Sequence, residues 1–334
     1  MAADSRPQGV PLRPGETAPL PEGCRRGPRP GQSPIPVQDI RHGRLPLLPR
    51  RHRRGPARPR HFRCTHRLAS ESALTLDRLR EIIPALPPEQ VMYSVRPLAN
   101  GDNFEGEFKR RPSERSLDET LALLPVADSY VMVNSPHVHP AFAPLREALM
   151  EDVGRLMQRR GVGSEPLSPK LFLFIASPGS VTPFHIDRYS TLLLQFRGTK
   201  TVTVFDPWDP RVVSPEATEA YMTYQNTKLH WDEGMNRLGT AYDFHPGEAL
   251  HIPFAAGHHV RNGTGDISIS MSIIFNTPES MRWREALAFN QWFRPKLGKV
   301  GLGLNPVGSA PARDRAKAAG WSALSKVRSL VRPD

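Results

Sequence analysis

The sequence predicts a mainly β protein with flanking helices, folded as a double-stranded β-helix, in which two antiparallel sheets form a jelly roll. Short strand-like segments follow one another at regular spacing between residues 169 and 276, and turn residues separate them. Helical segments precede and follow this run but do not alternate with the strands, as a parallel α/β sheet would require. The segments 191–196 and 267–275 each combine a small polar face with a bulky apolar face. Such strands either turn the polar face to solvent or line a barrel, and we favour the barrel.

An arginine- and proline-rich head, residues 1–66, is expected to be disordered. Residues 1–63 contain 14 arginines and four acidic residues, a net charge of +10, so the rest of the +12 chain carries only +2. Proline at this density excludes regular helix, and apolar residues are too sparse to form a core. The remainder therefore gives no strong nucleic-acid signal, whereas the head itself could contact nucleic acid or chromatin.

The cysteine content and hydropathy favour a cytoplasmic protein. Cys24 and Cys64 are the only cysteines, so neither a disulfide framework nor a cysteine-based zinc site is expected. No apolar run reaches the roughly 18 residues of a membrane span, and the N-terminus lacks the apolar core of a signal peptide. We therefore expect no membrane partner.

Residues 67–168 are expected to form a mixed helical and strand region that packs on the barrel. Apolar residues recur at helical spacing, and a serine at 116 with a glutamate three residues on is typical of a capping box. Helices are predicted over 73–86, 116–123 and 140–160, and strands over 91–95 and 129–134.

Residues 169–293 are expected to form the barrel and a helix that closes it. Turn-forming residues separate the strands, and residues 211–240 form an irregular or partly helical insertion that could cover a pocket. Strands are predicted over 171–175, 181–187, 191–196, 200–205, 242–244, 248–252, 258–261 and 267–275, and the closing helix over 279–293.

The last segment, residues 294–334, is predicted to be a glycine- and proline-rich linker followed by a basic tail. A mildly amphipathic helix is a candidate over 313–331, but we favour a poorly ordered tail.

The chemistry centres on His185 and Asp187. Two residues apart in an extended segment, they present an imidazole and a carboxylate on the same side. With a more distant histidine, they would make the two-histidine, one-carboxylate facial site of non-haem Fe(II) oxygenases. The tripeptide alone is weak evidence, because an ordinary strand can contain the same residues.

Four downstream histidines are candidates for the third ligand. His245 and His251 are more typical of polar strand-end or core positions. His258 and His259 follow a proline and a tight turn at the start of a strand, and they point to opposite faces of it. Only one of this pair can enter the barrel, and the residues alone do not decide which.

Lys200 shares its strand face with the apolar Val202 and Val204. Burying an ammonium group without a partner costs several kcal/mol. Either the lysine extends into solvent at the end of its strand, or it binds the distal carboxylate of a dicarboxylate co-substrate.

A resemblance to a known family is carried by three segments, with the sequences TPFHID, FRGTK and IPFAAGHHV. They resemble the jumonji-C and cupin-like Fe(II)/2-oxoglutarate oxygenases. In that family a threonine lies three residues before the first histidine ligand and a lysine thirteen residues after the aspartate, as Thr182 and Lys200 do here. The aromatic pair usual before the last histidine is Ala256 and Gly257 in this chain, which implies a smaller wall on that side.

The resemblance implies roles for seven residues. The implied metal ligands are His185, Asp187 and His258. The implied binders of the 2-oxoglutarate C5 carboxylate are Thr182 and Lys200, and the implied polar pocket residues near the co-substrate are Thr191 and Ser272.

The resemblance implies an oxygenase that uses Fe(II), 2-oxoglutarate and O2, releases succinate and CO2, and hydroxylates a protein side chain or a small molecule. Two alternatives stay open: a non-oxidative cupin that binds a metal or a sugar, and a chromatin- or nucleic-acid-associated module that acts through the head. Substrate identity, hydroxylation against demethylation, and the formation of a homodimer are not decided by the sequence.

Overall fold

The computed structural model describes residues 61–68, 72–108, 112, 114–161 and 163–331. Every described residue belongs to one compact unit. The predicted disorder of the head therefore falls, up to residue 60, outside the described residues.

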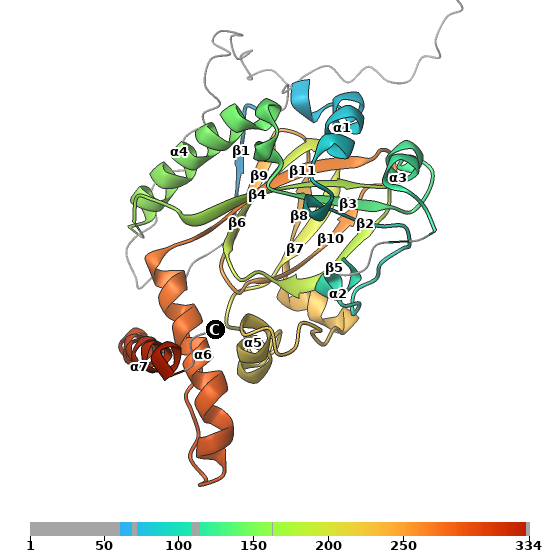
Figure 1. Cartoon of the computed structure of the whole chain (residues 1–334). Coiled ribbons are helices and arrows are strands. Elements are labelled where there is room, and N and C mark those ends of the chain that lie inside the picture. Colours follow the sequence, from blue (N-terminus) through green and yellow to red (C-terminus); the bar gives the residue numbers. More distant parts are fainter. Residues whose placement is uncertain (1–60, 69–71, 109–111, 113, 162, 332–334) are drawn as a thin grey trace, which may run out of the picture. The chain divides into compact units, whose positions relative to one another are not determined.

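The described strands form two antiparallel sheets (Figure 1). In the larger sheet, the order is β1 (Phe62–Thr65), β9 (Glu248–Ile252), β6 (Ser190–Arg197), β11 (Ser268–Asn276), β4 (Leu167–Ala176), β3 (Tyr130–Asn134), β2 (Val91–Ser94). In the smaller sheet, the order is β5 (Val181–Ile186), β10 (Gly257–Asn262), β7 (Lys200–Val204), β8 (Thr240–Phe244). Two antiparallel sheets with helices before and after them confirm the predicted fold class.

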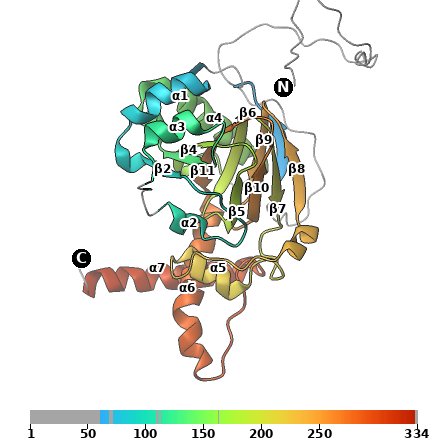
Figure 2. The ribbon, with the colours of Figure 1, turned by 90° about the vertical axis from the view of Figure 1, so that its right-hand side faces the viewer.

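Three helices cover the outer face of the larger sheet: α1 (Leu76–Ile82), α3 (Leu117–Leu123) and α4 (Ala143–Arg160) (Figure 2). The predicted capping box of α3 is present, with Ser116 and Glu119 each bonding the other's backbone. The bulky faces of β4, β6 and β11 pack against these helices in one core, which leaves the small polar faces of β6 and β11 for the barrel interior. The interior placement favoured from the sequence is therefore confirmed.

Shorter elements complete the region around the barrel. They are α2 (Phe104–Glu107), α5 (Pro215–Met222) and 3₁₀ turns at Ser72–Leu74, Ile83–Ala85, Pro88–Gln90, Pro136–Val138, Pro140–Phe142 and Glu233–Leu238. The insertion predicted over 211–240 contains α5 and the last of these turns.

The closing helix α6 (Pro278–Gly298) anchors α5 beside the barrel. Glu219 of α5 is fully buried, and it accepts hydrogen bonds from Asn290 (2.7 Å) and from Arg294 (2.7 and 2.6 Å) of α6. A carboxylate buried among donors holds its position firmly, because losing a partner would leave it uncompensated. This network fixes α5 near the end of the barrel that carries the candidate site.

Two predictions about the ends of the chain are wrong. Phe62–Thr65, assigned to the disordered head, forms β1 and pairs with β9, and Phe62 stacks on His251 at 4.8 Å. The predicted linker begins too early, because α6 continues to Gly298. Pairing with a neighbouring strand supplies the order that a four-residue segment does not have by itself.

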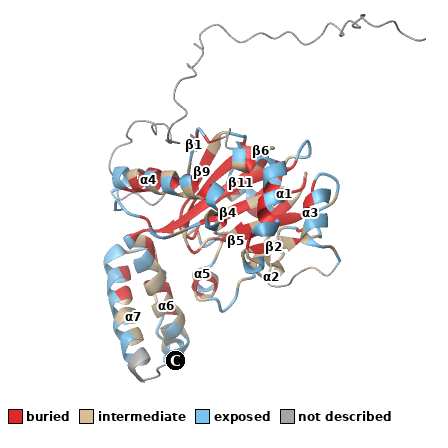
Figure 3. Ribbon diagram, turned by 45° about the horizontal axis from the view of Figure 1, so that its top comes forward, coloured by how far each residue is buried: buried red, intermediate tan, exposed pale blue. Residues whose placement is uncertain are grey.

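The C-terminal tail is also more ordered than expected, because α7 (Pro311–Val331) is a helix that packs on α6. Trp292 and Trp321 approach to 6.4 Å between ring centroids, and Ser322 donates a hydrogen bond to Glu285. Figure 3 shows that the strands of the barrel are mostly buried, whereas α6 and α7 expose much of their surface. Within the described residues, no helix is long and apolar enough to cross a bilayer.

Candidate metal centre

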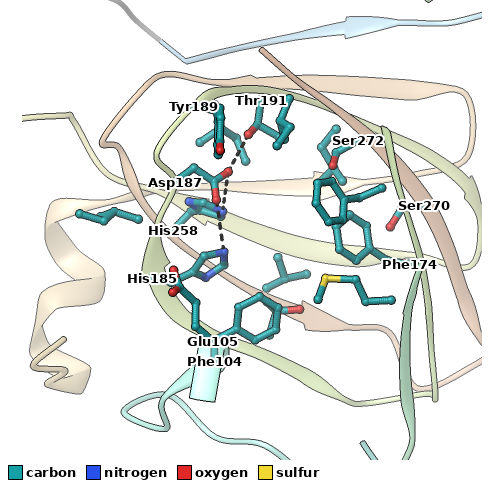
Figure 4. A pocket seen from close by; sticks show the side chains of 18 of the residues that line it. Phe104, Glu105, Phe174, His185, Asp187, Tyr189, Thr191, His258, Ser270 and Ser272 are labelled. Carbon is teal, nitrogen blue, oxygen red and sulfur yellow. Dashed lines mark hydrogen bonds and ion pairs between the residues drawn. The ribbon is translucent and has the colours of Figure 1, made fainter. Parts of the chain in front are cut away.

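His185, Asp187 and His258 converge at one end of the barrel (Figure 4). His185 of β5 and His258 of β10 are register partners, which places their side chains together across the smaller sheet. His185 Nε2 lies 3.9 Å from Asp187 Oδ1, and His258 Nε2 lies 3.9 Å from Asp187 Oδ2. The three ligand atoms lie within 4.8 Å of one another. The sequence-predicted triad is thus one cluster of three potential ligands.

Backbone carbonyls fix the orientation of both imidazoles. The Nδ1 of His185 lies 2.7 Å from the Pro183 oxygen, and the Nδ1 of His258 lies 3.1 Å from the Ala256 oxygen. A carbonyl accepts only, so each Nδ1 carries the proton and each Nε2 presents its lone pair toward Asp187. Burial lowers the pKa of both histidines, for His258 to about 4. Both rings are therefore neutral near pH 7, as metal ligation requires.

The structure brings His258, and not His259, together with His185 and Asp187. His259 points to the other face of β10, where its Nε2 lies 2.9 Å from Asn236 Oδ1 and its ring contacts Trp231. Gly257 permits the close approach of β10 to β5, since a Cβ at this position would lie 2.8 Å from the Phe184 ring.

Thr191 lies beside Asp187, on the cavity wall where the resemblance placed it. Its hydroxyl donates a 2.6 Å hydrogen bond to Asp187 Oδ2. A carboxylate held by a neighbouring donor keeps a fixed orientation toward a metal. Thr191 thus contacts the carboxylate of a candidate metal ligand.

Lys200 lies inside the same cavity as the triad and is only 8% exposed, which excludes the solvent-directed interpretation. Its ammonium donates a 2.9 Å hydrogen bond to Ser270, and burial lowers its pKa to about 7. Thr182 also lines the cavity and donates a long 3.4 Å hydrogen bond to the hydroxyl of Tyr130. Ser272 lies two residues beyond Ser270 on the same inward face of β11.

These side chains surround a cavity of about 230 Å³. All seven sequence-predicted site residues line it: Thr182, His185, Asp187, Thr191, Lys200, His258 and Ser272. His251 does not join them, since it stacks on Phe62, and among the described residues no second cluster of three metal-binding side chains has comparable spacing.

Sequence reasoning missed several residues that line the cavity, among them Phe104, Glu105 and Arg188. Arg188 is buried between the rings of Tyr221 and Tyr224, at 4.4 and 3.8 Å, and its Nε donates a 3.1 Å hydrogen bond to the Tyr221 carbonyl. Its guanidinium also forms an ion pair with Glu105 of α2. The ring of Phe104 lies 4.8 Å from that of His185. The position of Arg188 beside Asp187 was the one available cue, whereas nothing in the sequence connects residues 104 and 105 to this site.

Most of the chain matches the sequence model of one protein family. The sequence model of the cupin-like domain matches residues 60–298. No curated protein sequence matches the chain.

Solved structures resemble the chain only distantly. The ribosomal oxygenase YcfD of Escherichia coli is 14% identical over 84% of this chain and 67% of its own, with a TM-score of 0.47. A structure of YcfD with cobalt and 2-oxoglutarate is 15% identical over 80% of this chain and 63% of its own, with a TM-score of 0.43. The oxalate decarboxylase of Lactobacillus farciminis is 17% identical over 33% of this chain and 25% of its own, with a TM-score of 0.23. The match thus spans less than two thirds of the latter two chains, and at these scores the likeness carries no argument about activity.

Proposed function

Because the chain belongs to the family of cupin-like domain proteins, we propose that it is an Fe(II)- and 2-oxoglutarate-dependent oxygenase. Membership in this family confirms the resemblance indicated by the three sequence motifs. The proposed reaction hydroxylates a protein side chain or a small molecule with O2 and releases succinate and CO2. One fold can host several chemistries, so the proposal depends on the site itself.

The carrying observation is a buried lysine in the same cavity as two histidines and an aspartate. A metal site alone would suit any metal-binding cupin. A sugar-binding cupin has no need for a buried ammonium in the same cavity as the metal ligands, and burying that charge is costly. A dicarboxylate co-substrate accounts for the metal ligands and the buried lysine together, because one of its ends can bind the metal while the other pairs with Lys200.

The donor set fits Fe(II). Two neutral imidazole nitrogens and one carboxylate oxygen, close together on one side of the cavity, make the facial arrangement typical of non-haem Fe(II) oxygenases. His185, Asp187 and His258 would hold the ion, which supplies the activation of O2 when bound. Thr191 keeps Asp187 oriented through its 2.6 Å hydrogen bond.

The other residues bind and orient the co-substrate. The cavity offers the charged and hydroxyl donors that a terminal carboxylate needs, from Lys200, from its hydrogen-bond partner Ser270 and from Thr182. Phe104 and the Arg188–Glu105 pair line the same cavity and limit its contact with water. Excluding water strengthens each polar contact inside and protects reactive species from side reactions.

Turnover of 2-oxoglutarate tests the proposal. The full chain, supplied with Fe(II), 2-oxoglutarate and air, should form succinate and CO2 in equal amounts, and Asp187→Ala should abolish this. Asp206→Ala, which removes a largely exposed carboxylate, is the matched control and should retain the rate. No succinate from the wild type, or an equal rate in Asp187→Ala, contradicts the proposal.

A further inference from the structure

A buried asparagine, Asn262, lies opposite Lys200 in the smaller sheet, and we propose that it is a positioning residue of the co-substrate site. Its side-chain oxygen accepts a hydrogen bond from the Lys200 ammonium, directly or by way of one buried water, and holds that ammonium in its place. The inference rests on the proposed function and adds a residue to it.

The strand register places the two side chains together. Asn262 ends β10 and is paired with Lys200, which begins β7, and the register continues without a shift to the pair of His258 and Val204. Directly opposite residues of an antiparallel pair point to the same face, with Cβ atoms about 4.5–5.5 Å apart. Lys200 and His258 line the cavity, so Asn262 also points into the barrel.

The chain beside this pair keeps the two strand ends close. The backbone N–H of Gly263 donates a 2.7 Å hydrogen bond to the Thr199 carbonyl. A Cβ at residue 263 would lie 2.3 Å from the Thr199 hydroxyl oxygen, so glycine permits this approach. The end of β10 is therefore held against the start of β7.

The amide of Asn262 has one fixed orientation. Its Nδ2 donates a 2.8 Å hydrogen bond to the Ser180 hydroxyl, which donates its own proton to the Ser177 carbonyl at 2.8 Å. A hydroxyl whose proton is already donated can only accept, so the amino group of the amide faces Ser180 and Oδ1 faces away from it. Asn262 is only 4% exposed, and its Oδ1 has no hydrogen-bond partner among the described residues.

Lys200 has the complementary deficit. An ammonium carries three donors, and Ser270 is its one hydrogen-bond partner among the described residues. Buried donors and acceptors without partners destabilise a fold, because they have lost their hydrogen bonds to water. A bond between Lys200 and the Asn262 oxygen satisfies one group on each strand.

No charged group in the described part of the chain forms an ion pair with Lys200, and burial is the cause that lowers its pKa. Its register partners are Asn262 and Phe244, and its hydrogen-bond partner is Ser270, so none of the three carries a charge. The other titratable residues that line the cavity are three tyrosines and Glu105, His185, Asp187, Arg188 and His258. The oxygen of Asn262 is thus the acceptor that can hold the ammonium before a co-substrate binds.

Carbon-13 NMR of the full chain, with lysine labelled at Cε, measures the titration of Lys200. The chain has eight lysines, and the signal of Lys200 is identified by its loss in Lys200→Met. Asn262→Leu removes the acceptor, so the midpoint of Lys200 should fall by about one pH unit. Asn262→Asp keeps the shape and adds a carboxylate, so the midpoint should rise by at least about one unit. A merely structural role would not shift the midpoint in opposite directions.

Asn236→Leu is the matched control, because this exposed asparagine contacts His259 on the other face of β10. It should leave the midpoint of Lys200 unchanged. These titrations need neither metal nor 2-oxoglutarate, so they test Asn262 separately from the proposed function.

The affinity for 2-oxoglutarate is then measured with Zn(II) bound. Both Asn262 variants should bind 2-oxoglutarate about tenfold more weakly at pH 7 and retain the wild-type metal affinity. Leucine leaves Lys200 less charged, and aspartate competes with the co-substrate for it. Failure of the wild type to bind 2-oxoglutarate counts against the proposed function alone.

A midpoint of Lys200 in Asn262→Leu within about 0.2 pH units of the wild type overturns the assignment of Asn262. A midpoint that does not rise in Asn262→Asp also overturns it, and this variant of the same shape gives the answer if Asn262→Leu does not fold. An equal shift in Asn236→Leu would show that the effect is not local to Asn262 and would overturn the assignment as well.

Discussion

The ammonium of Lys200 lies 2.9 Å from the hydroxyl of Ser270, inside a cavity whose other polar side is the histidine–aspartate cluster. A hydroxyl is a weak partner for a buried cation, and burial lowers the lysine pKa to about 7. Keeping Lys200 charged in this cavity costs free energy until an anion binds beside it. It therefore links the binding of a dicarboxylate to the charge state of one residue.

Removing this ammonium should weaken co-substrate binding and spare the metal. Lys200→Met keeps the length of the side chain but loses its charge-assisted bond, so 2-oxoglutarate affinity should fall by about 100-fold. Calorimetric titration of 2-oxoglutarate and of the metal checks the two affinities separately. A variant that binds 2-oxoglutarate as well as the wild type would exclude the assigned role of Lys200.

The binding of 2-oxoglutarate should become weaker above pH 7. Below that pH, Lys200 is protonated in both the free protein and the complex, so the affinity is flat. Above it, the free lysine is neutral and the bound one is charged, so binding takes up a proton and affinity falls by up to about tenfold per pH unit. Titrations at pH 8 in two buffers of different ionisation enthalpy measure this proton. Equal binding enthalpies in both buffers would contradict the coupling of 2-oxoglutarate binding to protonation of Lys200. The same proton uptake in Lys200→Met would also contradict it.

Thr191 should control metal affinity through Asp187. Thr191→Val keeps the shape but removes the 2.6 Å hydrogen bond to Oδ2, which should reduce Fe(II) affinity by about 10- to 100-fold. Thr191→Ser retains the hydroxyl and should keep most of the wild-type Fe(II) affinity. Anaerobic metal titrations of the three proteins make the comparison. Normal Fe(II) affinity in Thr191→Val would limit this residue to packing.

Arg188 should contribute strongly to folding stability. Arg188→Met leaves Glu105 without its cation and breaks the link that joins the segment after β5 to α2 and α5, which should cost about 3 kcal/mol. Arg211→Met also removes one ion pair, but that arginine is exposed and should cost less than about 1 kcal/mol. Chemical denaturation compares the two. A similar loss of unfolding free energy in both variants would mean that Arg188 does not join these segments.

The central part of the fold was predictable because its signals are local. Alternating polar and apolar residues and the turns between them specify the strands, and the spacing of His185 and Asp187 specifies a shared direction. The choice between His258 and His259 was not predictable from alternation, because it depends on how β10 approaches β5. That pairing contains a register shift between His258 and Val260.

The missed features depend on contacts between distant segments. Strand β1 is too short to be recognised without its partner β9, and α7 is ordered by its packing on α6. Phe104 and Glu105 reach the site from about 80 residues upstream of His185 and Arg188, and only the folded chain brings them together.

The most direct test of the central claim is the visible absorption of the full chain under anaerobic conditions with Fe(II) and 2-oxoglutarate. Bidentate binding of the keto acid to an iron held by two histidines and a carboxylate should give a metal-to-ligand charge-transfer band. We predict this band in the wild type and its loss in Asp187→Ala. No band in the wild type, or an undiminished band in Asp187→Ala, would contradict the assignment of His185, Asp187 and His258 as the iron ligands.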